Sequence, residues 1–287
     1  MSSYISGSVG YTLLERNNEY ILVLADIHDG VKYCYIDSPI MIAKWLQQKS
    51  AKSSILLEEL LRENYNVSDL WPNAQHTKEL KQLNQIDNRI IPVDIRPSLL
   101  PFSWEIVDMN KELGKTTLFN YIKQLEDLFN VNSDFYNKYI KEQVHMMEIN
   151  QSRYKDSKVT PQVHYNEIKH IFNQFKEDTF NLMDKSITYI IKTNVSILER
   201  INNIISMLME WYVILLIFND VKNIIIHVGL AHSSRLILFL TKVYRYKIIE
   251  QSGINTIDDV NTSVPSACIK TSNAINAIYN KKYGFYN

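Results

Sequence analysis

The sequence predicts an α/β fold, in which a mixed but mainly parallel sheet is flanked by helices and a large all-helical insertion precedes the last core strands. Short, β-branched apolar runs recur in the first third of the chain and again at residues 224–228, and they are too short to be helices. Between residues 103 and 219, apolar residues recur at helical spacing instead. We therefore expect a single α/β domain over residues 1–287, with residues 103–220 as a helical insertion or cap.

The strands before the insertion follow from these runs. Residues 8–14 and 19–25 are separated by a short polar segment, so we expect a hairpin or two neighbouring strands. Runs at residues 53–57 and 89–93 are the next strands. Helical patterns at residues 40–49 and 75–85 lie between these strands and imply parallel β-α-β units.

After the insertion, the run at residues 224–228 predicts another buried strand. The apolar segment that follows predicts a helix whose N-cap is Ser233 or Ser234. Residues 246–250 predict a final strand, and the polar tail predicts only a short helix near residues 272–279.

Composition narrows the class of protein. The 287 residues are 46% hydrophobic and 22% charged, and 31 basic residues balance 31 acidic ones, so nothing indicates a nucleic-acid or membrane partner. The start lacks the pattern of a signal peptide, and the longest unbroken apolar run, at residues 211–218, is too short to span a bilayer. Cys34 and Cys268 are far apart, so we expect no disulfide framework and a reducing compartment. These features predict a soluble, cytoplasmic protein and leave a small molecule or peptide as the expected partner.

Polar side chains follow four of the predicted strands directly. The carboxyl ends of parallel strands meet at one edge of a sheet, where ligands bind in open α/β folds. The side chains concerned are Asp26 and His28, Glu58 and Glu59, Asp94 and Arg96, and His232. We expect them to form a site. Gly30 and Gly229 each lie within three residues of a site histidine in a chain with only 7 glycines, which predicts positive φ or a close approach there.

This set resembles the Tiki/TraB/erythromycin-esterase/ChaN superfamily, whose signature is two Gly-x-x-His motifs with a strand-end glutamate and an arginine between them. Gly229-Leu-Ala-His232 matches the second motif fully, and Ala25-Asp-Ile-His28 matches the first with alanine in place of glycine. Glu58 or Glu59 stands in the place of the glutamate, and Arg96 in that of the arginine. The resemblance covers most of residues 20–250, and it implies hydrolysis of an ester or peptide bond.

The expected chemistry has two forms. Two imidazoles and a carboxylate can bind a divalent metal such as Mn, Co, Zn or Fe, with His28, Glu58, His232 and Asp26 as the expected ligands. The same residues support a metal-free hydrolase, in which His28 or His232 is the general base and Glu58 orients it. Arg96 would stabilise an oxyanion or bind a substrate carboxylate. Asp94, Glu59 and Gly229 are expected to contact substrate, and Asp94 could instead hold a histidine in one tautomer.

Two other functions stay open at this point. A non-catalytic member of the same fold would bind a ligand or haem, for which the 18 tyrosines offer ligands. A calcineurin-like metallophosphoesterase would share the strand-end motif Asp26-Ile27-His28, but its remaining motifs do not occur. The other histidines have bland interpretations: His227 is expected in the core, and the rest are expected at the surface, namely His76, His145, His164 and His170.

Overall fold

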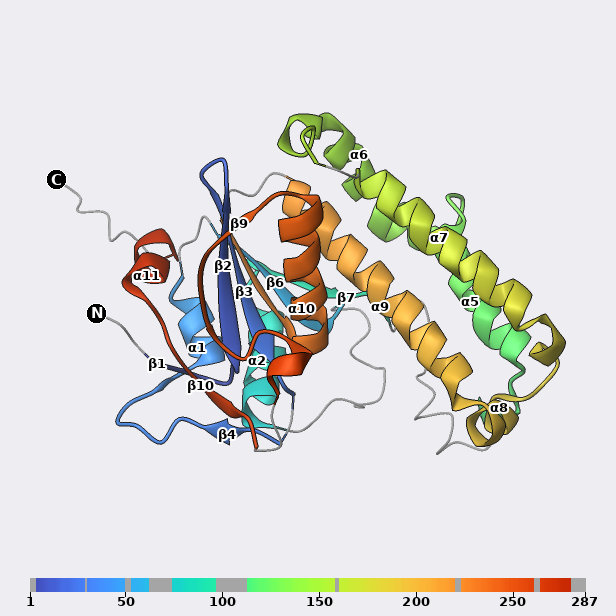
Figure 1. Cartoon of the computed structure of the whole chain (residues 1–287), viewed down its shortest axis with the longest axis horizontal. Helices are drawn as coiled ribbons and strands as arrows, with labels where there is room; N and C mark the ends of the chain where they lie inside the picture. The colour runs from blue at the N-terminus through green and yellow to red at the C-terminus, as the bar shows by residue number, and fades with distance from the viewer. Residues whose placement is uncertain are drawn as a thin grey trace. The chain divides into compact units, whose positions relative to one another are not determined.

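The chain forms two compact units, drawn in Figure 1 from a computed structural model. The structure describes residues 4–28, 30–49, 53–61, 74–96, 113–157, 160–219, 223–260 and 264–279. The sheet unit consists of the described parts of Met1–Arg62, Trp71–Val93 and Asp220–Asn287, and the helical unit of those in Asp94–Asn219. The predicted α/β class is confirmed, because the strands are mostly parallel, helices flank them, and a helical insertion interrupts the sheet unit in sequence.

The main sheet has six strands in the order β7-β6-β8-β3-β2-β9. Strands β3, β8 and β6 are parallel, whereas β2 pairs antiparallel with both β3 and β9. The predicted hairpin at residues 8–25 and the strand near residues 246–250 are therefore confirmed. The bounds are β2 Gly10–Arg16, β3 Glu19–Asp26, β6 Ser54–Leu60, β7 Ile90–Asp94, β8 Asn223–Gly229 and β9 Lys247–Gly253.

Strand β8 follows the helical insertion in sequence but lies between β3 and β6 in the sheet. Its run of isoleucines is fully buried, as expected for a central strand with both faces covered. The register pairs Asp26 with Gly229 and Leu57 with His227. The carboxyl ends of the three parallel strands consequently lie side by side, which is what the site requires.

Helices of the sheet unit itself cover this sheet. Helices α1 (Ile42–Gln47), α2 (Gln75–Ile86) and α11 (Asn273–Tyr279) contribute Trp45, Leu83 and Ile275 to one apolar cluster with the strands. Helix α10 (Leu230–Leu238) packs against β3 and β8. It begins directly after β8 with Gly229 as its N-cap, so the predicted serine cap is wrong. The Ser233 hydroxyl instead donates to the Leu230 carbonyl, 2.9 Å away.

A second, smaller sheet was not predicted. It has the order β4-β10-β1-β5, and its strands are β1 Tyr4–Ser6, β4 Lys32–Tyr33, β5 Ile40–Met41 and β10 Ser266–Lys270. The strands are too short to carry a periodic pattern. This sheet brings Cys34 and Cys268 together as a disulfide, with their Cα atoms 4.9 Å apart. The expectation of unpaired cysteines is therefore wrong, and the cysteines no longer support a reducing compartment.

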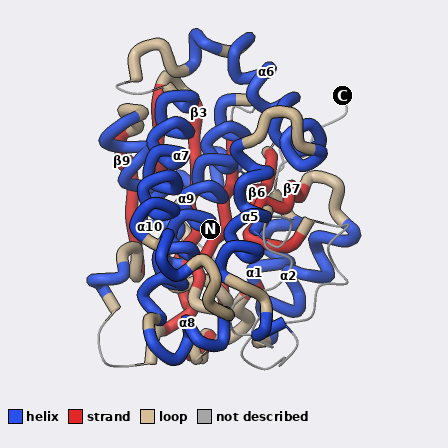
Figure 2. Tube along the Cα trace, turned by 90° about the vertical axis from the view of Figure 1, so that its right-hand side faces the viewer, coloured by secondary structure: helices blue, strands red, loops and turns tan. Residues whose placement is uncertain are grey.

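The helical unit is a set of packed helices with short connections (Figure 2). Its helices are α5 Leu118–Phe129, α6 Lys141–Ile149, α7 Pro161–Asp178, α8 Ile187–Thr193 and α9 Val195–Phe218, with short 3₁₀ and π turns between them. The Thr117, Thr160 and Ser186 side chains cap α5, α7 and α8 by accepting a backbone N–H of the first turn. Helices α7 and α9 pack through Tyr165 and Trp211, whose ring centroids lie 4.6 Å apart.

Helix α9 is long and apolar enough to cross a membrane by length and composition. However, 78% of its most apolar window is buried within the structure, as in the core helix of a soluble protein. Residues 208–218 of its second half are buried, and Trp211 donates its indole N–H to the Pro161 carbonyl, 2.9 Å away.

Candidate functional site

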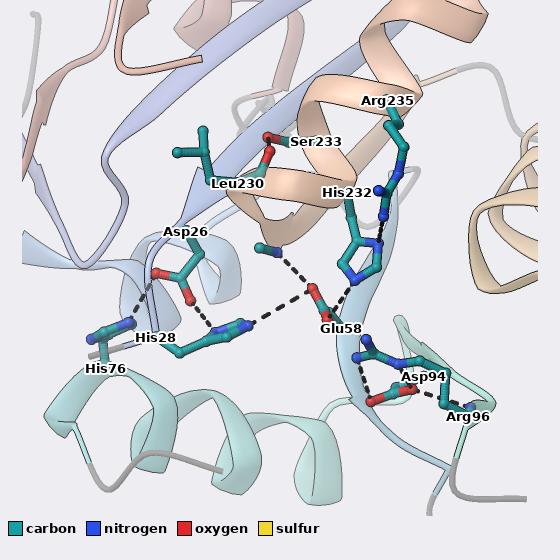
Figure 3. A network of polar contacts seen from close by, with 11 residues as sticks. Asp26, His28, Glu58, His76, Asp94, Arg96, Leu230, His232, Ser233 and Arg235 are labelled. Carbon is teal, nitrogen blue, oxygen red and sulfur yellow. Dashed lines mark hydrogen bonds and ion pairs between the residues drawn. The ribbon is translucent and has the colours of Figure 1, made fainter. Parts of the chain in front are cut away.

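The three motif side chains meet at the carboxyl ends of the parallel strands (Figure 3): His28 lies two residues after β3, Glu58 within β6 and His232 in the first turn of α10. Glu58 lies between the two histidines: its Oε2 is 4.0 Å from Nε2 of His28, and its Oε1 is 3.4 Å from Nε2 of His232. The backbone N–H of Gly229 also donates to Oε2 of Glu58, at 2.6 Å. The predicted convergence of His28, Glu58 and His232 is therefore present in the structure.

Gly229 is needed at this place because of space. Its φ of −55° is open to any residue, so positive φ is not the reason. A Cβ at this position would lie 3.1 Å from Nε2 of His28 and 3.3 Å from Oε2 of Glu58. A side chain would thus enter the gap between the histidine and the carboxylate. Gly30, by contrast, has φ +69° and open space around it, so there the backbone conformation is the reason.

Asp26 is the last residue of β3 and is buried. Its Oδ2 lies 2.8 Å from Nδ1 of His28, and its Oδ1 lies 2.9 Å from Nε2 of His76. Burial raises the pKa of Asp26, but the hydrogen bonds from the two histidines more than offset this and hold the pKa well below its ordinary value. Asp26 is therefore a carboxylate that accepts a hydrogen bond from each ring.

The partners of the two site histidines assign their tautomers. Nδ1 of a neutral His28 carries the hydrogen that Asp26 accepts, so Nε2 carries the lone pair and no hydrogen. For His232, an Arg235 nitrogen lies 3.4 Å from Nδ1, and because a guanidinium only donates, this Nδ1 is the acceptor. Nε2 of His232 then carries the hydrogen and points to Glu58. The two rings are different: His28 presents a base, and His232 presents a donor.

Solvent access also separates the two histidines. The His28 side chain is 32% exposed, whereas the His232 side chain is 8% exposed and the Glu58 side chain 4%. A molecule from solution therefore reaches His28 more readily than it reaches the other two side chains.

The remaining predicted site residues have other contacts. The Arg96 guanidinium binds the Asp94 carboxylate, with Nε 2.7 Å from Oδ1 and an amino group 2.9 Å from Oδ2. Asp26, and not Asp94, is thus the carboxylate that holds a site histidine. Glu59 is buried, and because successive strand residues point to opposite faces, it is directed away from the face of Glu58. The proposed substrate contacts of Asp94, Arg96 and Glu59 stay predictions.

The expectation that His76 and His164 lie at the surface is wrong, because both are buried. His145 and His170 are exposed, as predicted. His76 occupies the buried face of α2 with Leu80 and Leu83, and this spacing is a signal that the sequence did contain. His227 is buried in the core as predicted, and burial lowers its pKa to about 4.

The donor chemistry of His28, Glu58 and His232 suits a divalent metal. The arrangement is less favourable, since within the described parts of the chain no three His, Cys, Asp or Glu side chains are grouped as a metal site requires. Asp26, the fourth expected ligand, already accepts hydrogen bonds from two histidines.

No family model, curated protein or solved structure matches this chain. The function has to be inferred from the geometry of the site itself.

Proposed function

We propose that the protein is a hydrolase that uses His28 as a general base to add water to the carbonyl of an ester or peptide. The hydrogen bond between Asp26 and Nδ1 of His28 carries this proposal, because it leaves the lone pair of Nε2 facing Glu58 and His232. A histidine oriented in this way by a buried carboxylate is a general base for acyl transfer.

The roles follow from the contacts. Nε2 of His28 takes a proton from water as the oxygen attacks the carbonyl carbon, and it then returns that proton to the leaving group. Asp26 and Glu58, on the two sides of the ring, stabilise the imidazolium that exists between these steps. His232 directs its N–H toward Oε1 of Glu58 and so positions that carboxylate beside the His28 ring.

The metal-dependent form implied by the resemblance is a variant of the same proposal. His28, Glu58 and His232 would hold the ion, which would supply a polarised carbonyl and a more acidic water. The haem-binding alternative has no contact in the described residues that favours it. A red preparation with Soret absorption would nevertheless replace hydrolysis as the proposal.

The test compares wild-type protein with His28→Ala and His232→Ala on p-nitrophenyl acetate and a peptide library, with and without added Mn, Co, Zn or Fe. His145→Ala is the matched control, because this exposed histidine belongs to the helical unit. We expect hydrolysis to fall by at least about 100-fold in both site variants, which is the lower end for loss of a general acid or base, and to persist in the control. Metal analysis of the same samples tests the metal-dependent form. Wild-type protein that hydrolyses none of these substrates under any condition would overturn the proposal.

A further inference from the structure

A second histidine binds the carboxylate that orients His28. His76 comes from α2, 50 residues after Asp26, and its Nε2 lies 2.9 Å from Oδ1 of Asp26. Its side chain is fully buried. Asp26 thus receives one hydrogen bond on each oxygen, from His28 on one side and from His76 on the other (Figure 3).

The Asp26 carboxylate, which only accepts, requires the hydrogen of His76 on Nε2, and Tyr33 is the partner of the other nitrogen. The Tyr33 hydroxyl lies 2.8 Å from Nδ1 of His76, and the two rings meet edge to face. When the phenol donates to Nδ1, the hydrogen of the neutral ring must be on Nε2, which then donates to Asp26. Tyr33, His76, Asp26 and His28 form one continuous chain of hydrogen bonds, which we call the buried relay.

Tyr33 is itself fixed by the small sheet. It pairs with Ala267 across β4 and β10, and the next residue, Cys34, is bonded to Cys268. The outer end of the buried relay is therefore attached to the fold on both sides of the tyrosine.

The His28 ring lies between two carboxylates that compete for its hydrogen. Oδ2 of Asp26 is 2.8 Å from Nδ1, and Oε2 of Glu58 is 4.0 Å from Nε2. A neutral ring carries one hydrogen: on Nδ1 it leaves Nε2 as a base, whereas on Nε2 it turns toward Glu58 and the base is lost. The orientation of Asp26 decides between these two states.

We propose that His76 and Tyr33 are positioning residues that hold Asp26 against Nδ1 of His28, so that Nε2 of His28 keeps its lone pair for the reaction. This inference rests on the proposed hydrolase, but its structural content is a statement about the tautomer of His28. Neither residue needs to contact the substrate.

The experiment uses full-length His76→Leu, His76→Gln and Tyr33→Phe variants. Glutamine is the conservative replacement, because its amide can donate to Asp26 and accept from Tyr33. With p-nitrophenyl acetate as substrate, we expect kcat of His76→Leu to fall about 10- to 100-fold at nearly constant KM, as for loss of an interaction that acts only in the transition state. His76→Gln should recover most of this loss, and Tyr33→Phe should lose only a few-fold.

The second measurement is the ¹⁵N NMR signature of the His28 ring, which reports the tautomer without any substrate. We expect the Nδ1–H form in wild-type protein and in His76→Gln, a mixture with the Nε2–H form in His76→Leu, and a smaller share of the Nε2–H form in Tyr33→Phe. An unchanged tautomer and kcat in folded His76→Leu would overturn the proposal, and if this variant does not fold, an unchanged tautomer in Tyr33→Phe would do so. If wild-type protein hydrolyses nothing but the His28 tautomer still changes in the variants, the proposed hydrolase function is wrong and the positioning role of His76 and Tyr33 stands.

Discussion

The sheet unit and the helical unit treat charged and polar side chains differently. In the sheet unit, the Asp26 and Glu58 side chains, 1% and 4% exposed, are bonded to histidines and to a backbone N–H at the ends of parallel strands. In the helical unit, the Arg200–Asp178 ion pair lies at the surface, with the two side chains 47% and 59% exposed, whereas Arg96 and Asp94, where the chain enters this unit, are 17% and 2% exposed. The helical unit also buries His164 and Glu210, which lie on α7 and α9.

The difference follows from the free energy of burying a charge. A buried carboxylate costs free energy unless hydrogen bonds satisfy it, so a fold keeps two of them near each other only where donors such as histidine rings and backbone N–H groups bind them. A surface ion pair contributes little, because water and salt screen it. We therefore place the proposed reaction in the sheet unit. Each prediction below changes residues of one unit and states what sets that unit apart from the other.

The largest effect is expected from Asp26→Asn. An asparagine amide can donate to Nδ1 of His28, which selects the tautomer with hydrogen on Nε2 and removes the base. We expect hydrolysis of p-nitrophenyl acetate to fall about 1,000-fold, or about 4 kcal/mol of transition-state stabilisation. Asp178→Asn makes the same chemical change in a surface ion pair and should leave the rate unchanged. Equal rates in the two variants would remove the distinction between the units.

Removal of the disulfide is the next largest change. The bond closes a loop with a sequence separation of 234 residues, and loss of a native disulfide typically costs about 2–5 kcal/mol. We expect Cys34→Ser with Cys268→Ser to lower the free energy of unfolding by about this amount in urea titrations. Because Cys34 adjoins Tyr33 of the buried relay, kcat should fall as well. Wild-type protein treated with a reductant should reproduce both changes, and full stability after reduction would contradict the prediction.

The helical unit should respond to acid through His164. Burial lowers its pKa to about 4, below the value of about 6.5 in an unfolded chain. The unfolded state then binds the proton first, so the stabilisation is complete above about pH 6.5 and is lost as the pH falls toward 4. The total loss is about 3 kcal/mol.

Urea unfolding of wild-type protein and His164→Leu at pH 7, 6 and 5 measures this contribution. The variant should show a shallower fall in the free energy of unfolding with decreasing pH. His170→Leu is the matched control, because it removes an exposed histidine from the same helix. An identical pH dependence in wild-type protein and His164→Leu would show that His164 does not titrate in this range.

The smallest effect is expected for the surface pair of Arg200 and Asp178. Their nitrogen and oxygen lie 2.7 Å apart, but exposed pairs typically contribute less than about 1 kcal/mol. A double-mutant cycle with Arg200→Ala and Asp178→Ala should give a coupling free energy in this range, and added salt should reduce it. A coupling free energy well above 1 kcal/mol would show that this ion pair stabilises the helical unit more than the exposure of its two side chains indicates.

Local pattern was enough to predict most elements of the fold. Buried strands such as β3 and β8 have short β-branched runs, and the helices of the insertion have apolar residues at helical spacing. Helix starts were less well predicted: a serine cap was expected for α10, but Gly229 ends the strand and begins the helix at once. The strands of the small sheet, such as β4 and β5, are too short for any periodicity.

The sequence by itself determined that His28, Glu58 and His232 lie at or just beyond the carboxyl ends of buried strands, because strand and helix periodicities are local properties of the chain. Only the tertiary structure decided that β8 lies between β3 and β6, which brings Glu58 between the two histidines. The tertiary structure also decided two hydrogen bonds: Asp26 with His76, 50 residues away, and His76 with Tyr33, 43 residues away. It likewise decided the pairing of Cys34 with Cys268. Such contacts depend on how strands order themselves and helices pack, and no local pattern encodes the choice of a distant partner.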